Sequence, residues 1–133
     1  MITRRALLTY GFMAALGSLT ACTQDPGLRA LQGDPMASWA PNGMVSEDRD
    51  EQGASQQSGF SSAPSLARRI HMDSADAAEA ASIQAKDVAT SYSWKAIPDS
   101  PFLGKSLDGG FSGELFVSIS ERDANALIIS LSC

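Results

Sequence analysis

The sequence predicts a small α+β domain over residues 65–133, in which one helix covers one face of a mostly antiparallel sheet. Three observations predict this fold class. Residues 75–91 are rich in alanine and contain neither Gly nor Pro, which favours a helix. Residues 111–120 and 126–132 alternate apolar with polar side chains, as half-buried strands do. The whole chain of 133 residues leaves room for one modest domain.

The predicted order of elements is β-α-β-β-β. A first strand over residues 66–72 is followed by Asp73 and Ser74, a pair that is typical of a helix start. We expect Asp73 to be the N-cap and Asp76 to lie near the positive end of the helix dipole. The apolar residues of this helix recur every three or four positions and therefore share one face: Ala78, Ala81, Ala85, Val88 and Tyr92.

A second strand is predicted at residues 94–97, and a right-handed crossover through the helix joins it to the first strand. Residues 98–110 are rich in Pro, Asp and Gly and predict a loop. The two alternating runs that follow predict a hairpin. Its apolar face, which the helix covers, consists of Leu115, Val117, Ile119, Leu127, Ile129 and Leu131.

The N-terminus has the organisation of an export signal. Arg4 and Arg5 precede an apolar run over residues 6–19, and small residues ending in Cys22 follow it. This run is shorter than the roughly 20 residues that a membrane-spanning helix needs. We therefore expect residues 1–21 to be a signal peptide that is removed.

The cleavage site resembles that of bacterial lipoprotein precursors, whose lipobox Leu-[Ala/Ser/Thr]-[Gly/Ala]-Cys is matched by Leu19-Thr20-Ala21-Cys22. The resemblance implies cleavage between Ala21 and Cys22 and diacylglyceryl transfer to the Cys22 thiol. Acyl chains such as palmitate would then hold the protein on the extracytoplasmic face of the cell membrane. Residues 3–8 also resemble the twin-arginine export signal, but paired arginines are common in general secretory signals too. Both export routes stay open.

Residues 22–64 are expected to form a lipidated Cys22 followed by a flexible, acidic linker. In residues 23–64, Gly, Pro, Ser and Gln supply 20 of 42 residues, and residues 47–51 read Glu-Asp-Arg-Asp-Glu. Such a segment has too little apolar surface to offset its chain entropy. As a coil it spans on the order of 35 Å, which would hold the domain away from the membrane.

Three residues are candidates for a partner-binding surface: Trp39, Phe116 and Ile128. Trp39 lies in residues 34–41, where two prolines restrict the backbone and predict a docking segment. Alternatively, Trp39 packs back on the domain or lies near the lipid surface. Phe116 and Ile128 fall on the polar face of the predicted hairpin, where they form a partner-binding spot, an ordinary cross-strand contact or a seat for Trp39.

Charge and motif content exclude several functions. After cleavage the chain carries 8 basic and 15 acidic residues, a net charge of −7, which argues against binding nucleic acid or anionic headgroups through a basic patch. His71 is the only histidine, with no Cys-x-x-Cys to complete a metal site and no Gly-x-Ser-x-Gly elbow. Residues 104–106, Gly-Lys-Ser, lack the first glycine of a P-loop. We expect no catalytic residue, no metal and no cofactor.

Cys133 is the only thiol that remains once Cys22 carries lipid, so no intramolecular disulfide is expected. Outside the cytoplasm, Cys133 either joins two chains or is an incidental thiol on a frayed end.

The layout of the mature part resembles the small lipoproteins of high-GC Gram-positive bacteria, which have an Asp-Pro-Met/Leu-Ala island, a linker and a compact α+β head. This resemblance transfers no activity to any residue. The sequence therefore predicts a membrane-anchored, non-catalytic binding module with an envelope protein as its partner. The alternatives are a small envelope enzyme or ligand-binding protein that uses His71 or residues 98–110, and a purely structural spacer.

Overall fold

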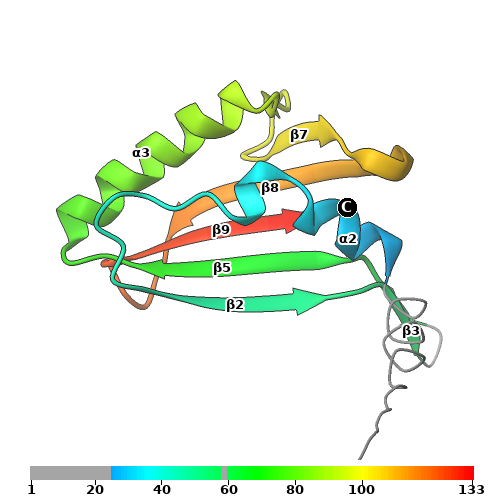
Figure 1. The fold of residues 1–133 in the computed structure, drawn as a ribbon, viewed down its shortest axis with the longest axis horizontal. Coiled ribbons are helices and arrows are strands. Elements are labelled where there is room, and N and C mark those ends of the chain that lie inside the picture. The colour runs from blue at the N-terminus through cyan, green and yellow to red at the C-terminus, as the bar shows by residue number, and fades with distance from the viewer. Residues whose placement is uncertain (1–24, 58–59) are drawn as a thin grey trace, which may run out of the picture.

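The fold is α+β (Figure 1). The computed structural model describes residues 25–57 and 60–133 of the chain. A six-stranded antiparallel sheet has the order β2-β5-β9-β8-β7-β6, and β3 and β4 form a separate hairpin. The helical elements are α2 (Pro26–Gln32), η1 (Pro35–Ala37), α3 (Ala75–Ser91) and η2 (Asp108–Gly110). The strands are β2 (Ser46–Gln52), β3 (Ser55–Gln57), β4 (Phe60–Ser62), β5 (Ser65–His71), β6 (Lys95–Ala96), β7 (Leu103–Ser106), β8 (Ser112–Ile119) and β9 (Ala126–Ser132).

The C-terminal hairpin is confirmed as predicted. In the antiparallel pair β8–β9, Leu115 lies opposite Leu131 and Val117 opposite Ile129. Leu115, Ile129 and Leu131 are fully buried. Because side chains alternate between the two faces of a strand, this register places one continuous apolar face toward the helices.

Helix α3 has the predicted bounds but a different cap. The hydroxyl of Ser74 accepts a hydrogen bond from the Ala77 N–H at 3.1 Å, so Ser74 is the N-cap and the prediction of Asp73 was wrong. The helix packs on β8 and β9 through small residues, which lets it lie close to the sheet. Its buried residues are Ala78, Ala81, Ser82, Ala85 and Ala89. The predicted apolar face is therefore correct except at its C-terminal end, where Tyr92 is exposed.

The segment predicted as a loop over residues 98–110 contains a strand. In β7, Leu103 to Ser106 pair with β8, and Leu103 and Gly104 pair with the short edge strand β6. The meander from β6 to β9 therefore has one more strand than the predicted order. The residues around β7 are typical of turns and did not predict a strand. Pairing with the longer strand β8 stabilises it instead.

The flexible linker predicted over residues 22–64 is wrong for the described part of that segment. Asp25 caps helix α2 by accepting from the Leu28 N–H at 3.0 Å, and Pro26 occupies the first turn. Strand β2 pairs with β5 over its full length, from Ser46 opposite His71 to Gln52 opposite Ser65. The fold therefore includes Asp25, forty residues before the predicted start of the domain.

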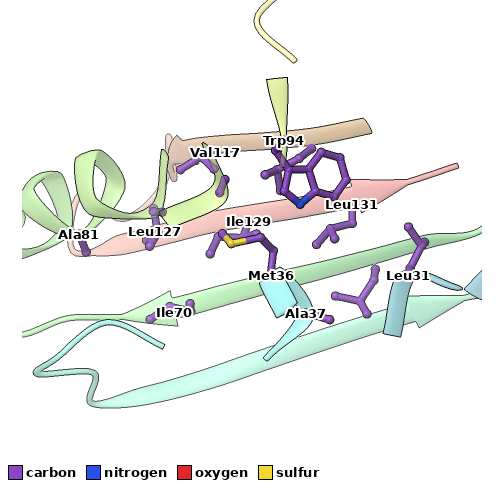
Figure 2. Close-up of a cluster of buried hydrophobic side chains, with 14 of the residues drawn as sticks. Leu31, Met36, Ala37, Ile70, Ala81, Trp94, Val117, Leu127, Ile129 and Leu131 are labelled. Carbon is purple, nitrogen blue, oxygen red and sulfur yellow. The ribbon is translucent and has the colours of Figure 1, made fainter. Parts of the chain in front are cut away.

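The core explains why this segment folds (Figure 2). Leu31 from α2 and Met36 from η1 are completely buried and belong to the same cluster as Trp94 and the apolar face of the sheet. Helix α3 and the α2–η1 segment thus share one face of the sheet. An apolar face that α3 alone would leave half uncovered is closed by a segment whose average composition is polar.

The burial of Leu31 and Met36 predicts a large effect on stability. Leu31→Ala and Met36→Ala should each lower the free energy of unfolding by about 2–5 kcal/mol, because each leaves a cavity in the shared core. Urea denaturation followed by tryptophan fluorescence measures this. Val45→Ala is the matched control, since Val45 is 61% exposed and its truncation should leave the midpoint unchanged. Variants as stable as the wild type would mean that residues 25–45 do not belong to the core.

Candidate functional site

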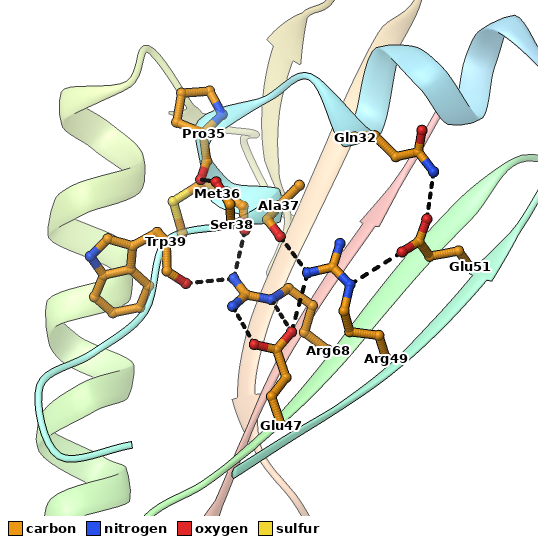
Figure 3. A network of polar contacts seen from close by, with 10 residues as sticks. All are labelled: Gln32, Pro35, Met36, Ala37, Ser38, Trp39, Glu47, Arg49, Glu51 and Arg68. Atoms are coloured by element: carbon orange, nitrogen blue, oxygen red, sulfur yellow. Dashed lines mark hydrogen bonds and ion pairs between the residues drawn. The ribbon is translucent and has the colours of Figure 1, made fainter. Parts of the chain in front are cut away.

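A buried arginine holds the N-terminal segment on the sheet (Figure 3). Arg68 faces the core from β5 and is 1% exposed. Its Nε and Nη2 donate to the two carboxylate oxygens of Glu47 on β2, both at 2.7 Å. Its Nη1 donates to the carbonyls of Met36 at 3.0 Å and Trp39 at 2.6 Å. The guanidinium therefore joins β5 to the neighbouring strand and to the turn after η1.

The alternate charged residues of β2, Glu47, Arg49 and Glu51, lie on the same side of the sheet as Arg68. Arg49 donates from Nη1 to the Ala37 carbonyl at 2.7 Å and forms ion pairs with Glu47 and Glu51, both at 3.2 Å. Hydrogen bonds from Arg68 hold the pKa of Glu47 below its ordinary value of 4.5, against the opposing effect of burial. The pKa of Glu51 is also lowered, chiefly by hydrogen bonding to Gln32. These charged residues of β2 therefore form a network of ion pairs and hydrogen bonds that reaches the α2–η1 segment.

A buried aspartate makes the second polar connection. Asp34 is 5% exposed, and its Oδ2 accepts from the Met36 N–H at 2.9 Å and the Trp94 Nε1–H at 3.0 Å. Its Oδ1 accepts from Lys105 Nζ at 2.5 Å, and that ammonium lies 5.7 Å from the centre of the Trp94 ring. Lys105, from the Gly-Lys-Ser sequence, therefore neutralises a buried carboxylate. Asp34 and Arg68 are both used in holding the fold together.

The opposite face of the sheet is open in the part of the chain that the structure describes. Along β5 and β9, buried residues alternate with residues that are half-buried or exposed, and the helices pack only on the buried side. On β5 and β9 the side chains of the open face are mostly small, and Arg69, Phe116 of β8 and Ile128 stand among them, while Asp48 and Asp50 of β2 and Glu114 of β8 add exposed carboxylates to the same face. The small residues are Ser65, Ala67, Ser118, Ser130 and Ser132. Figure 1 shows α2 and α3 together over the other side.

Two of the three predicted surface residues lie on this open face, but they do not pair with each other. Phe116 lies opposite Ser130, and Ile128 lies opposite Ser118. The Phe116 ring instead contacts Phe102, with 5.4 Å between ring centres. Ile128 lines a shallow hollow of about 290 Å³ together with Arg69, Ala67 and the aspartates of β2. Phe116 and Ile128 are therefore separate features of one surface.

Trp39 belongs to the opposite layer, where it packs back on the domain as the alternative prediction has it, and it is not part of the open face. Its side chain is half-buried against the core cluster, and its carbonyl accepts from Arg68. Because Arg68 points to the core side of β5, Trp39 cannot seat on Phe116 or Ile128. The predicted docking segment over residues 34–41 is instead a covering of the protein's own core, with Met36 and Ala37 buried.

A cleft of about 750 Å³ lies near the β6 edge of the sheet. Gly104 lies in its lining, between Lys95 and Glu114 in the register. The rest of the lining is Ser93, Ile97, Lys105, Ser106, Ser112 and Gly113. Gly113 is required here, since a Cβ would approach Leu107 to 2.8 Å and Trp94 to 3.0 Å. The cleft therefore includes part of the segment predicted as a functional loop over residues 98–110.

His71 is far from this cleft. Its Nε2 lies 3.0 Å from Asp48 Oδ2, and its Nδ1 lies 3.8 Å from Asp123 Oδ2. His71 ends β5, whereas Glu114 is level with the start of that strand, six residues or about 20 Å away. The cleft, which includes Gly104 to Ser106 of this segment, and His71 are thus at opposite ends of the sheet.

Of the two cysteines, only Cys133 lies within the residues that the structure describes. Cys22 and the predicted cleavage site lie outside the described residues. Cys133 is part of the fold, because its N–H donates to the Pro64 carbonyl at 3.3 Å and its Sγ lies 3.5 Å from the Gly27 carbonyl oxygen. Burial, followed by the charge of Asp25, raises the pKa of the Cys133 thiol. The expectation of a frayed end at Cys133 was therefore wrong.

No protein-family model, curated protein or solved structure matches the chain. Within residues 25–57 and 60–133, no three side chains of His, Cys, Asp or Glu gather as a metal-binding group. None of the helices in these same ranges has the length and apolar character needed to span a bilayer.

The Glu47–Arg68 pair predicts an acid-sensitive contribution to stability. Because the pKa of Glu47 is lower in the folded protein, its contribution is present above pH 4.5 and is lost as the pH falls through the folded-state pKa. Glu47→Gln should cost about 3 kcal/mol at pH 7, since Arg68 stays buried without its counter-ion. Denaturation at pH 7 and at pH 3 should show the difference from wild type shrinking at pH 3. Asp50→Asn, on the exposed side of β2, should change little at either pH. A constant difference at both pH values would contradict this role.

Proposed function

We propose that the protein is a lipid-anchored, non-catalytic binding module of the cell envelope, and that the open face of its sheet binds a protein partner. One observation carries the binding surface: both helical layers cover the same side of the sheet, which leaves the other side accessible. On that side Phe116 and Ile128 are half-buried apolar residues that are surrounded mostly by polar ones.

The composition of the open face suits a protein better than a small molecule. Arg69 lies on β5 beside Ile128, and the pair offers an apolar contact next to a cation that has no ion-pair partner among the described residues. Interfaces typically have such a centre, enriched in apolar residues and arginine and surrounded by polar residues. The small serines and alanines around it let a partner approach the backbone closely.

The anchor is proposed from the sequence alone. Leu19-Thr20-Ala21-Cys22 matches the lipobox at all four positions. Attachment of two acyl chains at Cys22 would hold the module durably on the outer face of the membrane. Asp25, the N-cap of α2, would then follow the lipidated residue by only three positions.

A second candidate function is ligand binding in the cleft between β6 and β8. It is favoured by the volume of about 750 Å³ and by the charged side chains of Lys95 and Glu114 in the lining. This is the form of the ligand-binding alternative that uses residues 98–110 without His71.

Lipidation is tested by metabolic labelling. Cells that express the wild-type chain should incorporate palmitate into a band that stays with the membrane fraction, and Cys22→Ala should remove both the label and the membrane retention. Cys133→Ser is the matched control, because it removes the other thiol and should leave the label unchanged. Label retained in Cys22→Ala would refute the anchor.

The partner surface is tested by crosslinking in intact cells followed by mass spectrometry. Arg69→Glu/Ile128→Ser should weaken capture of the main partner at least about tenfold, as expected for loss of a central contact. Lys86→Glu/Ile83→Ser makes the same chemical changes on the exposed side of α3 and should leave capture unchanged. Equal capture by both double variants would contradict the assignment of the open face.

A further inference from the structure

The cleft places two opposite charges on either side of a glycine. In the register, Lys95 lies opposite Gly104, and Gly104 lies opposite Glu114. Residues that are directly opposite share a face of the sheet, so these three form one row across β6, β7 and β8. With adjacent strands about 4.8 Å apart, the Cα atoms of Lys95 and Glu114 are about 10 Å apart. The Ile97 side chain covers Gly104 between them, since a Cβ built on Gly104 would lie 3.3 Å from Ile97 Cδ1, so the two charges lie on either side of an apolar floor.

Both charges are available for a ligand. Among the described residues, neither Lys95 nor Glu114 has an ion-pair or hydrogen-bond partner through its side chain, and both are exposed. The other lysine of the cleft, Lys105, is paired with the buried Asp34. The hydroxyls of Ser93, Ser106 and Ser112 add polar groups to the lining. The cleft therefore offers one free cation and one free anion, with donors around them.

The row also has a defined position relative to the predicted anchor. Glu114 lies opposite Ser132, which precedes Cys133, and Cys133 Sγ lies 3.5 Å from the Gly27 carbonyl oxygen near the start of α2. Asp25, the first described residue, is three residues after Cys22, so at full extension it is at most about 11 Å from Cys22. The predicted lipid and the row of the cleft are thus at the same end of the sheet strands.

We propose that this cleft binds a zwitterionic phospholipid headgroup, with the phosphate at Lys95 and the primary ammonium at Glu114. The inference rests on the proposed lipid anchor, which brings the cleft to the membrane surface. A neutral headgroup with two charges matches a cleft with one cation and one anion. An anionic headgroup would face Glu114 and a chain whose net charge after cleavage is −7.

The proposal is tested by NMR on the lipidated, ¹⁵N-labelled protein in nanodiscs of phosphatidylglycerol. The soluble headgroup glycerophosphoethanolamine is added, and the backbone amide signals of Gly104 and Gly113 are followed. We expect these signals to shift and saturate, and glycerophosphoglycerol, which has no amine, to leave them unchanged. In nanodiscs with half phosphatidylethanolamine, the shifts should be present before any headgroup is added.

Charge variants distinguish a zwitterion site from a simple ion site. Lys95→Glu and Glu114→Lys should each weaken headgroup binding at least tenfold, whereas the double exchange should recover most of it, because a zwitterion can bind in the reversed orientation. Lys86→Glu, on α3, is the control and should bind like wild type. Both cleft residues are exposed, so the variants are expected to fold.

Three outcomes would overturn the proposal. Gly104 and Gly113 signals that never saturate would show that the cleft is not a site. Equal shifts with the headgroup that has no amine would show an anion site. Shifts with the soluble headgroup but none in phosphatidylethanolamine discs would show that the ligand is not membrane lipid. Failure of the anchor itself is recognised separately, as loss of palmitate label.

Discussion

The burial of one guanidinium on a central strand constrains the rest of the structure. Arg68 occupies a core-facing position of β5, where an unpaired charge would cost several kcal/mol. Its four hydrogen bonds go to Glu47 and to the carbonyls of Met36 and Trp39, all N-terminal to β5. The part of the sheet from β5 onward therefore cannot supply the hydrogen-bond partners that Arg68 needs in the core. It needs β2 and the α2–η1 segment, and this requirement makes residues 25–133 one folding unit.

Asp34 imposes the reciprocal requirement. It is a buried anion of the N-terminal segment, and its partners Trp94 and Lys105 come from the C-terminal half. Each half thus supplies a buried charge that only the other half can neutralise. Small domains rarely gain much stability from one core, and the core that the two halves share extends beyond what residues 65–133 hold. The same pairing fixes which side of the sheet is covered, and so which side is left open.

The sequence was informative where structure is local and misleading where it is not. The α3 helix and the β8–β9 hairpin follow from spacing within a single segment, and both were predicted with nearly correct bounds. The predicted flexible linker includes residues 47–51, because their average composition is charged. In the structure Glu47, Arg49 and Glu51 alternate toward Arg68. Two features of the sequence could have indicated this strand: charged residues at alternate positions, 47, 49 and 51, and an arginine, Arg68, within the apolar strand β5. The partners are too far apart in the chain for spacing to reveal them.

Replacing a long linker by a folded segment changes what the module can reach. A coil of 42 residues would have let the domain sample a volume on the order of 35 Å in radius. Because the fold includes Asp25, only two residues separate it from Cys22, where the proposed lipid would be attached. The strands then extend away from the end near Asp25, from the row of Glu114 and Ser132 to the turn beyond His71. If the proposed anchor at Cys22 holds the domain this close to the membrane, a partner of the proposed open-face surface would have to come to the membrane. The proposal therefore favours partners that are themselves embedded in or attached to the same membrane.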